Sequence, residues 1–531
     1  MTMAAVDPVA HRPVFRWHAV AALLLVLIGS ARIVSTYAVF SHTIDEPDHL
    51  AAGMEWLSVG KYRYEDLHAP LARIFGALGP FLAGERWHGG PNSYMEGYRI
   101  LGHGAHYDRF LSLGRAGILP FFWVGALVVY LWTRRIAGSL AAVLSVLLFT
   151  TLPPVLAHAG LITTDMAATA FTGAAALASL SWAQSPGRRQ CIMLGALSGL
   201  AVLSKFSALL FLPAGWALMY ACHLVRTHPG LRPSMREFAR RKQGIAIVLA
   251  TAFLTVWAGY LFSFGKVDFL HARLPAQHFF LGLQSLWAHN AAGHPSYVLG
   301  RRSSSGFWYY YPVVLAVKTP LAMLALLLGL PWLWRKIPNR SGVLMPLAFS
   351  SGVLMVALAD HLNTGVRHVL PVYVGLCVCC GVVAGSVFRA RTRRRAWLPM
   401  AAVVLLLAWQ AISGALQHPD YLAYTNELAG RYPERFVADS DLDWGQDMKR
   451  LGAFLRQAGV TELTFTPFNR TYALAGHALP PMTPGDSERP SPGWNAVSIT
   501  LWKVFGFPAW AGTMSQQYRV GRSILLWYFP Q

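Results

Sequence analysis

The sequence is poor in charged residues, and acidic residues are the scarcest of them. Of its 531 residues only 13% are charged, with 24 acidic against 45 basic side chains, while 54% are hydrophobic and the mean hydropathy is +0.39. This composition excludes an ordinary soluble globular protein, because such proteins carry roughly twice this share of charge. It predicts a polytopic membrane protein.

Cysteine is scarce as well, and its positions exclude a disulfide framework. Disulfides form between cysteines that face an oxidising compartment. All the cysteines of this chain fall inside apolar runs and none lies in a segment predicted to be external. We interpret them as small packing residues. They are Cys191, Cys222, Cys377, Cys379 and Cys380.

A cleavable signal and an internal repeat are also missing. Arg32 interrupts the first apolar run and no A-x-A pattern follows it, so this run is expected to be a retained span. No self-similarity relates one half of the chain to the other, whereas transporters are often built from such repeats. This absence disfavours a transporter or flippase for polyprenyl lipids.

Long apolar runs are what the chain does have. We expect about 11 transmembrane helices in an all-α polytopic membrane domain over residues 1–415. Two short runs are separated only by SKFS, so a re-entrant hairpin is an alternative there. The predicted spans are 17–40, 115–133, 137–155, 166–183, 190–204, 207–225, 244–263, 308–334, 342–359, 368–388 and 397–415.

Basic residues gather in every second loop between these spans. By the positive-inside rule this predicts a cytoplasmic N-terminus and an external C-terminus in the plasma (inner) membrane. The excess positive charge is then explained by topology, and no nucleic acid partner is expected. The residues concerned are Arg12, Arg16, Arg134, Arg135, Arg188, Arg189, Arg226, Arg232, Arg236, Arg240, Arg241, Lys242, Arg335, Lys336, Arg340, Arg389, Arg391, Arg393, Arg394 and Arg395.

Four external segments remain for chemistry: the loops 41–114, 156–165 and 264–307, and the region 416–531. The first loop contains HAPLARIFGALGPFLAG, which is too short to span and suits a helix in the membrane interface. The C-terminal region has an alternating, turn-rich sequence with one helical stretch, DMKRLGAFLRQAG. It is predicted to be a small α/β region.

The pair Asp45-Glu46 follows the first span, within a turn or two of the membrane surface. A catalyst that acts on a membrane-borne phosphate ester needs a base and an orienting acid close to the headgroups. The alternative is structural: Asp45 caps a helix that has Pro47 in its first turn. The spacing alone leaves the two interpretations open.

Two other acidic positions carry hypotheses. Asp165 lies at the outer mouth of a span, where a carboxylate indicates a functional site or a helix cap. In DSDLDWGQD, Asp439, Asp441, Asp443 and Asp447 match the spacing of a calcium-binding loop, but Trp444 and Arg450 replace the required glycine and glutamate. We therefore expect these acids to cap and orient a helix that begins near Trp444; the alternative is that they reach the active site or its acceptor.

The order of these motifs resembles a known family. The Asp-Glu pair is followed by HAPLAR, TTD, GHPSYVLG, WYYYPVVLAVKTP, LNTGVRHVLPVY and DSDLDWGQD. This order looks like the dolichyl-phosphate-mannose protein mannosyltransferase branch of the GT-C glycosyltransferases. The bacterial undecaprenyl-phosphate-sugar transferases, including the lipid A aminoarabinose transferases, are similar in design.

The resemblance implies an inverting transfer of a sugar from a polyprenyl-phosphate donor, on the outer face of the membrane, to a glycan, lipid or protein acceptor. It implies Asp45 as general base, Glu46 as an orienting group and Asp165 as the acid of the second loop. Arg73 corresponds to a cation near the lipid phosphate, with snorkelling to headgroups as its alternative. Lys318, Arg367 and His368 are candidates for binding the donor phosphate or for anchoring the interface.

No cofactor and no metal-binding residues are predicted, and a requirement for a divalent metal is left open. Two other classes of function stay in view. One is a polyprenyl-lipid transporter or flippase, and the other is a non-catalytic lipid-binding membrane subunit.

Overall fold

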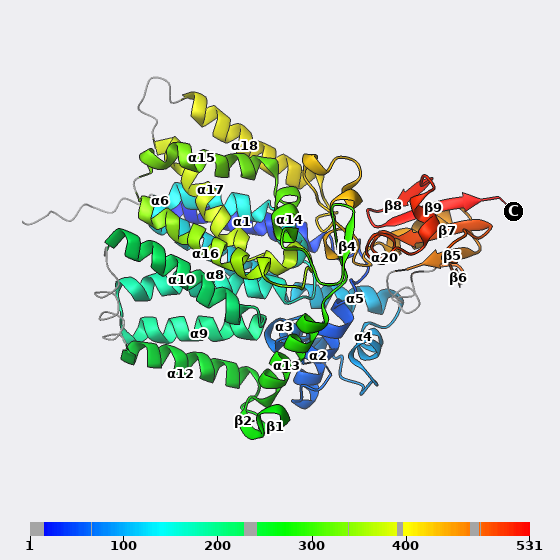
Figure 1. Cartoon of the computed structure of the whole chain (residues 1–531), viewed down its shortest axis with the longest axis horizontal. Helices are drawn as coiled ribbons and strands as arrows, with labels where there is room; N and C mark the ends of the chain where they lie inside the picture. The colour runs from blue at the N-terminus through cyan, green and yellow to red at the C-terminus, as the bar shows by residue number, and fades with distance from the viewer. Residues whose placement is uncertain are drawn as a thin grey trace, which may run out of the picture.

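The computed structural model describes residues 15–530 except 65, 228–241, 338, 390–396, 468–476 and 478. Figure 1 shows a helical part at one end and a part that contains a β-sheet at the other. Of the basic residues used for the topology prediction, Arg12, Arg232, Arg236, Arg240, Arg241, Arg391, Arg393, Arg394 and Arg395 lie outside the described residues.

Eight helical segments of the described chain are long and apolar enough to cross a membrane, or up to nine if a bent pair counts as one span. The protein is therefore an integral multi-pass membrane protein. The helices concerned are α1 (Phe15–Val34), α5 (Gly104–Ala116) continuous with α6 (Leu119–Thr150), α8 (Asp165–Gln184), α10 (Ala208–Thr227), α12 (Lys242–Gly259), α16 (Arg340–Leu358), α17 (Val372–Arg389) and α18 (Trp397–Leu416).

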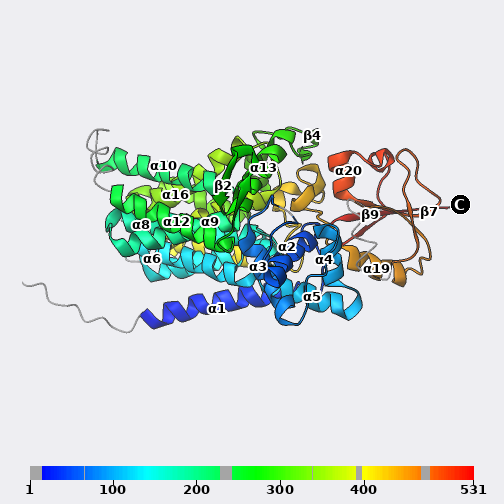
Figure 2. The same ribbon diagram turned by 90° about the horizontal axis from the view of Figure 1, so that it is seen from below.

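Burial separates central helices from peripheral ones. In α17, 83% of the apolar window is buried, against 17% in α1 and 6% in α12. Figure 2 shows α1 along the edge of the helical part. Helices whose apolar side chains stay uncovered are expected to face lipid.

Helix α6 folds back on itself at Gly138. This glycine has φ 79°, which a residue with a Cβ rarely adopts. The Thr133 hydroxyl donates to Ser145 Oγ over 2.8 Å, although residues twelve apart in a straight helix lie about 18 Å apart. The two apolar runs predicted at 115–133 and 137–155 thus lie side by side.

Two predicted spans differ from the structure. The first ends at Val34, not at 40, because Thr36, Tyr37 and Val39 donate to carbonyls three residues back and form turns. The run at 308–334 is broken into α14 (Tyr310–Lys318) and α15 (Leu321–Leu333), which meet at 109°. Pro320 stands at the break, where it has no N–H to continue the helical ladder.

The first loop is a compact helical unit. It contains α2 (Glu46–Val59), α3 (Pro70–Leu82) and α4 (Ser93–Leu101), which pack with α5 around Leu50, Met54, Ile100 and Leu111. Gly53 permits close packing, since a Cβ there would lie 2.0 Å from the carbonyl oxygen of Arg73. Helix α3 corresponds to the predicted interfacial helix, and its Leu82 is 76% exposed.

The remaining helices and connections link the spans. The two-stranded hairpins β1–β2 and β3–β4 are antiparallel, with Phe264 opposite Pro275 and Ser296 opposite Ser303. The elements are α7 (Pro153–Ala159), α9 (Arg188–Ser204), β1 (Phe264–Val267), η1 (Asp268–Leu270), β2 (Ala272–Pro275), α13 (Gln277–Ala292), β3 (Ser296–Val298), β4 (Arg301–Ser303), η2 (Trp334–Lys336) and η3 (Val366–Val369).

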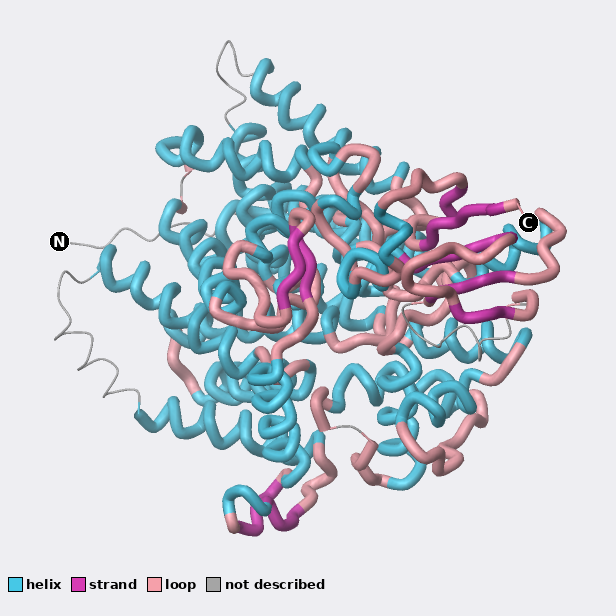
Figure 3. Tube along the Cα trace, turned by 45° about the vertical axis from the view of Figure 1, so that its right-hand side comes forward, coloured by secondary structure: helices cyan, strands magenta, loops and turns pink. Residues whose placement is uncertain are grey.

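The C-terminal region is α/β, as predicted. Its strands lie together at the end of the molecule that carries the C-terminus (Figure 3). The five-stranded sheet has the order β6-β5-β7-β9-β8, in which β5 runs parallel to β6 and β7 while β9 is antiparallel to β7 and β8. Helix α19 packs Leu451 and Leu455 against this sheet. The elements are η4 (Glu427–Ala429), η5 (Pro433–Arg435), η6 (Asp439–Asp441), α19 (Met448–Gln457), β5 (Leu463–Thr466), β6 (Met482–Pro484), β7 (Gly493–Ser498), α20 (Ile499–Phe505), η8 (Ala509–Gly512), β8 (Tyr518–Val520) and β9 (Ile524–Phe529).

Candidate active site

Three distant segments meet where the helical part joins the C-terminal region. The start of the first loop runs against the DSDLDWGQD segment, since Ile44 N–H donates to Trp444 O over 3.1 Å and Ser41 N–H donates to Gln446 O over 3.0 Å. On the other side, Asp441 Oδ1 accepts the N–H of Val366 over 3.0 Å. These backbone contacts bring Asp45, Arg367 and Trp444 together.

Asp45 and Arg367 form an ion pair at this junction. Arg367 Nη1 donates to Asp45 Oδ2 over 2.9 Å, and the side chains are 15% and 21% exposed for Arg367 and Asp45 respectively. Asp45 occupies the N-cap position of α2, but its side chain makes no capping hydrogen bond. The carboxylate is turned toward Arg367 and does not cap the helix. The structure therefore does not support the alternative that Asp45 serves only as a helix cap.

Arg367 is held in place by its other contacts. Its Nε donates to Thr364 O over 2.9 Å, and its guanidinium carbon lies 4.2 Å from the centre of the Trp444 ring. Burial alone would lower the pKa of Arg367, but the nearby carboxylates of Asp45, Asp165 and Asp439 raise it above its ordinary value. This arginine therefore stays positively charged, paired with Asp45 and stabilised by the charges of Asp165 and Asp439.

The second acid, Asp165, has a cation of its own. Its side chain is 1% exposed and Oδ1 accepts from Lys205 Nζ over 2.7 Å. Oδ2 has no hydrogen-bond partner among the described residues, nor does Nδ1 of His158, which lies 4.0 Å away. Burial of the imidazole, opposed by Asp165, lowers the pKa of His158 to about 3, so this histidine is neutral at physiological pH.

Glu46 faces away from Asp45 and is fully buried. Its carboxylate accepts from Arg115 Nη2 over 2.8 Å, from the N–H of Thr43 over 2.7 Å and from the N–H of Ile162 over 3.0 Å. These bonds tie the first loop to the turn before Asp165. Glu46 thus fixes the position of Asp45 and lies away from the ion pair itself.

Arg73 is completely buried on α3. Its Nη2 lies 2.7 Å from Asp48 Oδ2, and its Nε donates to His49 Nδ1 over 2.9 Å. Asp48, His49 and His68 form a group of possible metal ligands among the described residues, yet the guanidinium of Arg73 contacts all three of them. The cation of this cluster is the arginine, and its side chain faces protein in this conformation.

The other two candidates for phosphate binding also have protein partners. Lys318 is 1% exposed and donates to Leu422 O over 2.7 Å and to Asp441 O over 2.6 Å. His368 Nε2 lies 3.1 Å from Asp360 Oδ2, and its ring stacks on Tyr311. Of the four predicted phosphate ligands, Arg367 alone is paired with Asp45.

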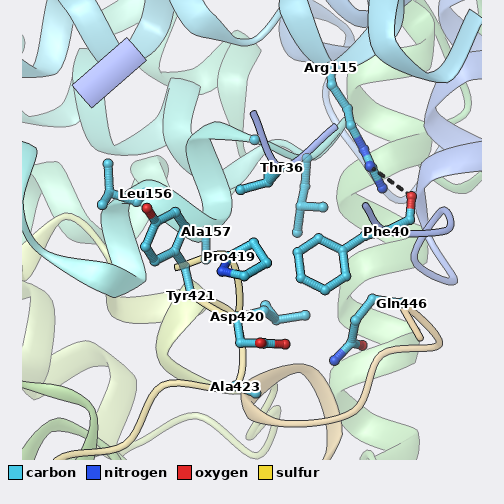
Figure 4. Close-up of a pocket in the computed structure, with 13 residues that line it drawn as sticks. Thr36, Phe40, Arg115, Leu156, Ala157, Pro419, Asp420, Tyr421, Ala423 and Gln446 are labelled. Carbon is cyan, nitrogen blue, oxygen red and sulfur yellow. Dashed lines mark hydrogen bonds between the residues drawn. The ribbon is translucent and has the colours of Figure 1, made fainter. Parts of the chain in front are cut away.

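A pocket lies beside this junction, between the end of α1, α7 and residues 419–423 (Figure 4). Arg115 reaches it from α5 while donating to Phe40 O over 3.3 Å. Most of its lining is aliphatic or aromatic, and its volume is only about 30 Å³, which is about the space of one water molecule. The lining residues are Thr36, Phe40, Arg115, Leu156, Ala157, Gly160, Leu161, Pro419, Asp420, Tyr421, Leu422, Ala423 and Gln446.

Comparisons with known proteins support the predicted resemblance. Residues 121–258 match a family model described as dolichyl-phosphate-mannose-protein mannosyltransferase. The crystal structure of ArnT from Cupriavidus metallidurans bound to undecaprenyl phosphate matches at 13% identity with a TM-score of 0.52, over 95% of this chain and 97% of that one. The S. cerevisiae protein O-mannosyltransferase Pmt1–Pmt2 complex bound to the sugar donor matches at 10% identity with a TM-score of 0.55, over 77% of this chain and 90% of that one.

This chain has the fold of the GT-C glycosyltransferases. The resemblance predicted from the motif order is confirmed at this level. None of the curated proteins matches the sequence.

Sequence reasoning missed several features of the candidate site. Lys205, the basic residue of SKFS, pairs with Asp165, and nothing in the sequence pattern indicated this contact. His294, from GHPSYVLG, lies close enough to Arg367 and Asp45 that they affect its pKa, which burial lowers. Asp439 was predicted only as a capping acid, yet its carboxylate helps to raise the pKa of Arg367, and its φ of 53° is uncommon for a residue with a Cβ.

The acids of DSDLDWGQD neither converge on one cation nor cap the helix. Asp441 accepts from Val366, Asp443 accepts the N–H of Thr500 over 2.9 Å, and Asp447 accepts from the Ser523 hydroxyl over 2.8 Å. Helix α19 begins at Met448, and its N-cap Asp447 makes no capping bond. The predicted capping role is wrong, because Asp441, Asp443 and Asp447 each accept a hydrogen bond from another part of the chain.

Proposed function

We propose that this protein is an integral membrane glycosyltransferase that moves a sugar from a polyprenyl-phosphate donor to a glycan, lipid or protein acceptor. The observation that carries the proposal is the pair of Asp45 and Arg367. A base for the acceptor and a cation for the departing phosphate lie 2.9 Å apart, and both are partly exposed. The other predicted acids and cations are buried and paired with protein groups, while Asp165 keeps one carboxylate oxygen, Oδ2, without a hydrogen-bond partner among the described residues.

In the proposed reaction Asp45 removes the proton from an acceptor hydroxyl. The acceptor oxygen attacks the anomeric carbon on the face opposite the phosphate, and the bond between that carbon and the phosphate oxygen breaks. The phosphate leaves as an anion that Arg367 stabilises, so no acid partner is needed. Attack from the opposite face inverts the anomeric centre, and one committed carboxylate suffices.

Asp165, Lys205 and His158 are proposed to orient the substrates. The free Oδ2 of Asp165 and the neutral His158 offer acceptors for substrate hydroxyls at a buried position. Lys205, which is 19% exposed, supplies a second positive charge near the leaving group.

The donor class rests on the relatives. ArnT was solved with undecaprenyl phosphate and the Pmt1–Pmt2 complex with its sugar donor. A lipid-linked donor also agrees with a site at the end of the membrane helices. We extend this donor class to the present chain as a proposal.

The topology is proposed to comprise eleven spans in the plasma membrane. The described part of the chain has eight helical segments long enough to span. Three more spans come from counting the α6 hairpin as two, the bent pair α14 and α15 as one, and the 17-residue α9 as one. The N-terminus is then cytoplasmic, and the active site and C-terminal region are external.

The direct test is transfer by the purified protein from a synthetic polyprenyl-phosphate sugar. Mass analysis of envelope glycans, lipids and proteins from cells with and without the chain identifies the acceptor first. Release of polyprenyl phosphate that depends on this acceptor supports the proposal. Acceptor-independent binding with no release would instead indicate a lipid-binding subunit, and movement of intact donor across vesicles would indicate a flippase.

A further inference from the structure

A second hollow lies outside the candidate active site, on the surface between the β3–β4 hairpin and the η4–η5 segment. Its volume is about 390 Å³, within the range of small-molecule sites. Its main lining residues are Leu299, Leu428, Arg431, Tyr432, Arg435 and Phe436. None of them contributes to the proposed transfer reaction.

The hollow carries positive charge that is not neutralised. Arg431 and Arg435 are exposed, and neither has a carboxylate partner among the described residues. Glu434 lies between them in sequence but is buried and pairs with Arg519 over 2.6 Å. The guanidinium carbon of Arg435 lies 4.9 Å from the centre of the Tyr432 ring. Two arginines without an acid suit a phosphate group.

The rim of the hollow is apolar. Leu428 is 59% exposed and Leu299 is 45% exposed. Leu299 stands with Gly300 in the two-residue turn of the hairpin and has φ 51°, a position where asparagine or glycine is usual. A leucine held outward in an unfavourable backbone conformation points to a function for its side chain.

The position of the hollow is at the outer end of the membrane helices. Glu427, one residue before Leu428, accepts from the indole N–H of Trp409 on α18 over 3.2 Å. Asn426 donates to Thr319 O over 2.7 Å, at the bend between α14 and α15. Figure 1 shows β4 where the helical part meets the part that contains the sheet. Cations and exposed leucines therefore occur together where lipid headgroups meet acyl chains.

We propose that this hollow binds the phosphate headgroup of an anionic membrane phospholipid. Arg431 and Arg435 hold the phosphate, while Leu299 and Leu428 lie along the first carbons of an acyl chain. The bound lipid joins the C-terminal region to the bilayer surface. This site is independent of the proposed transferase activity, and no bond is made or broken in it.

The test uses the purified full-length protein in a neutral detergent with added phosphatidylglycerol or phosphatidylcholine. Native mass spectrometry counts the retained lipid. The wild type is expected to retain phosphatidylglycerol in preference, and Arg431→Gln with Arg435→Gln to lose that preference by roughly tenfold or more, as charged hydrogen bonds disappear. The matched control replaces two exposed arginines of the C-terminal region elsewhere, Arg456→Gln with Arg489→Gln, and should retain the lipid.

Two competitors separate the possible sources of the anion. Inorganic phosphate and a soluble polyuronic acid should displace phosphatidylglycerol poorly, because neither offers a chain to Leu299 and Leu428. Leu299→Ser with Leu428→Ser should weaken lipid retention with both arginines intact. Equal retention of phosphatidylglycerol by the wild type and the arginine double variant would overturn the proposal. Displacement of phosphatidylglycerol by an equal concentration of the polyuronic acid would overturn it as well.

Discussion

Arg367 and Asp45 are 322 residues apart in the chain, yet their side chains meet over 2.9 Å. The contact joins the first loop to the segment before α17, and Trp444 from the C-terminal region covers the guanidinium. A site assembled from three separate segments depends on the whole fold. Its two charged groups can be tested one at a time.

Replacing Arg367 tests the phosphate-binding role. Arg367→Gln removes the charge but keeps a hydrogen-bond donor, so kcat/KM for the donor should fall by roughly 10- to 100-fold, as expected for a lost charge-assisted hydrogen bond. Arg367→Lys should retain part of the activity. Steady-state kinetics with a synthetic donor measure both variants. An unchanged kcat/KM in a correctly folded Arg367→Gln protein would remove this residue from the mechanism.

Arg73 is expected to act through stability. Arg73→Met leaves Asp48 as a buried charge without its cation, which costs about 3–5 kcal/mol of unfolding free energy. Thermal unfolding in detergent should show a clear decrease in Tm. Arg109→Met, in the same loop but exposed, is the matched control and should change little. A stable Arg73→Met protein with a raised KM for the donor would restore the role that the family resemblance implies.

Asp443 is expected to make stability depend on pH. Burial raises its pKa to about 6, although Ser498 and Thr500 donate hydrogen bonds to it. The folded state then holds a proton that the unfolded chain releases near pH 4, so stability should fall as pH rises from about 4 to about 6. The size of this effect is about 1–3 kcal/mol. In Asp443→Asn the decrease in Tm over this range should be smaller, and an identical profile would contradict the assignment.

Topology can be tested with reporter fusions. A reporter after Arg241 should be active only if it functions in the cytoplasm, and one after Gln457 only if it functions outside. The proposed odd number of spans places these points on opposite faces. If both fusions report the same face, the span count and the external placement of the site are wrong together.

The sequence indicated which segments carry the candidate site but not how they meet. The Asp-Glu pair and the VRHVLPVY block were both recognised, and each supplies one half of the ion pair. Which of two adjacent carboxylates faces the site depends on partners far away in sequence: Asp45 meets Arg367, whereas Glu46 meets Arg115. Neither local propensity nor periodicity contains such information.

The sequence also could not show which cations are already paired with protein groups. Lys318 and Arg73 occupy positions typical of phosphate ligands, yet their side chains are satisfied by Asp441 O and Asp48. A sequence shows that a cation is near the membrane surface but not whether a neighbouring carboxylate already neutralises it. The break at Pro320, by contrast, follows from the chemistry of proline, and VKTP could have indicated it.

The central claim is that Asp45 is the general base, and one measurement tests it most directly. Asp45→Asn keeps the size of the side chain and can still accept from Arg367, but it cannot take a proton. The rate of sugar transfer by purified, monodisperse Asp45→Asn protein should fall by roughly 10²- to 10⁴-fold, with the wild-type Tm nearly retained. Near-normal turnover by this variant would contradict the base assignment.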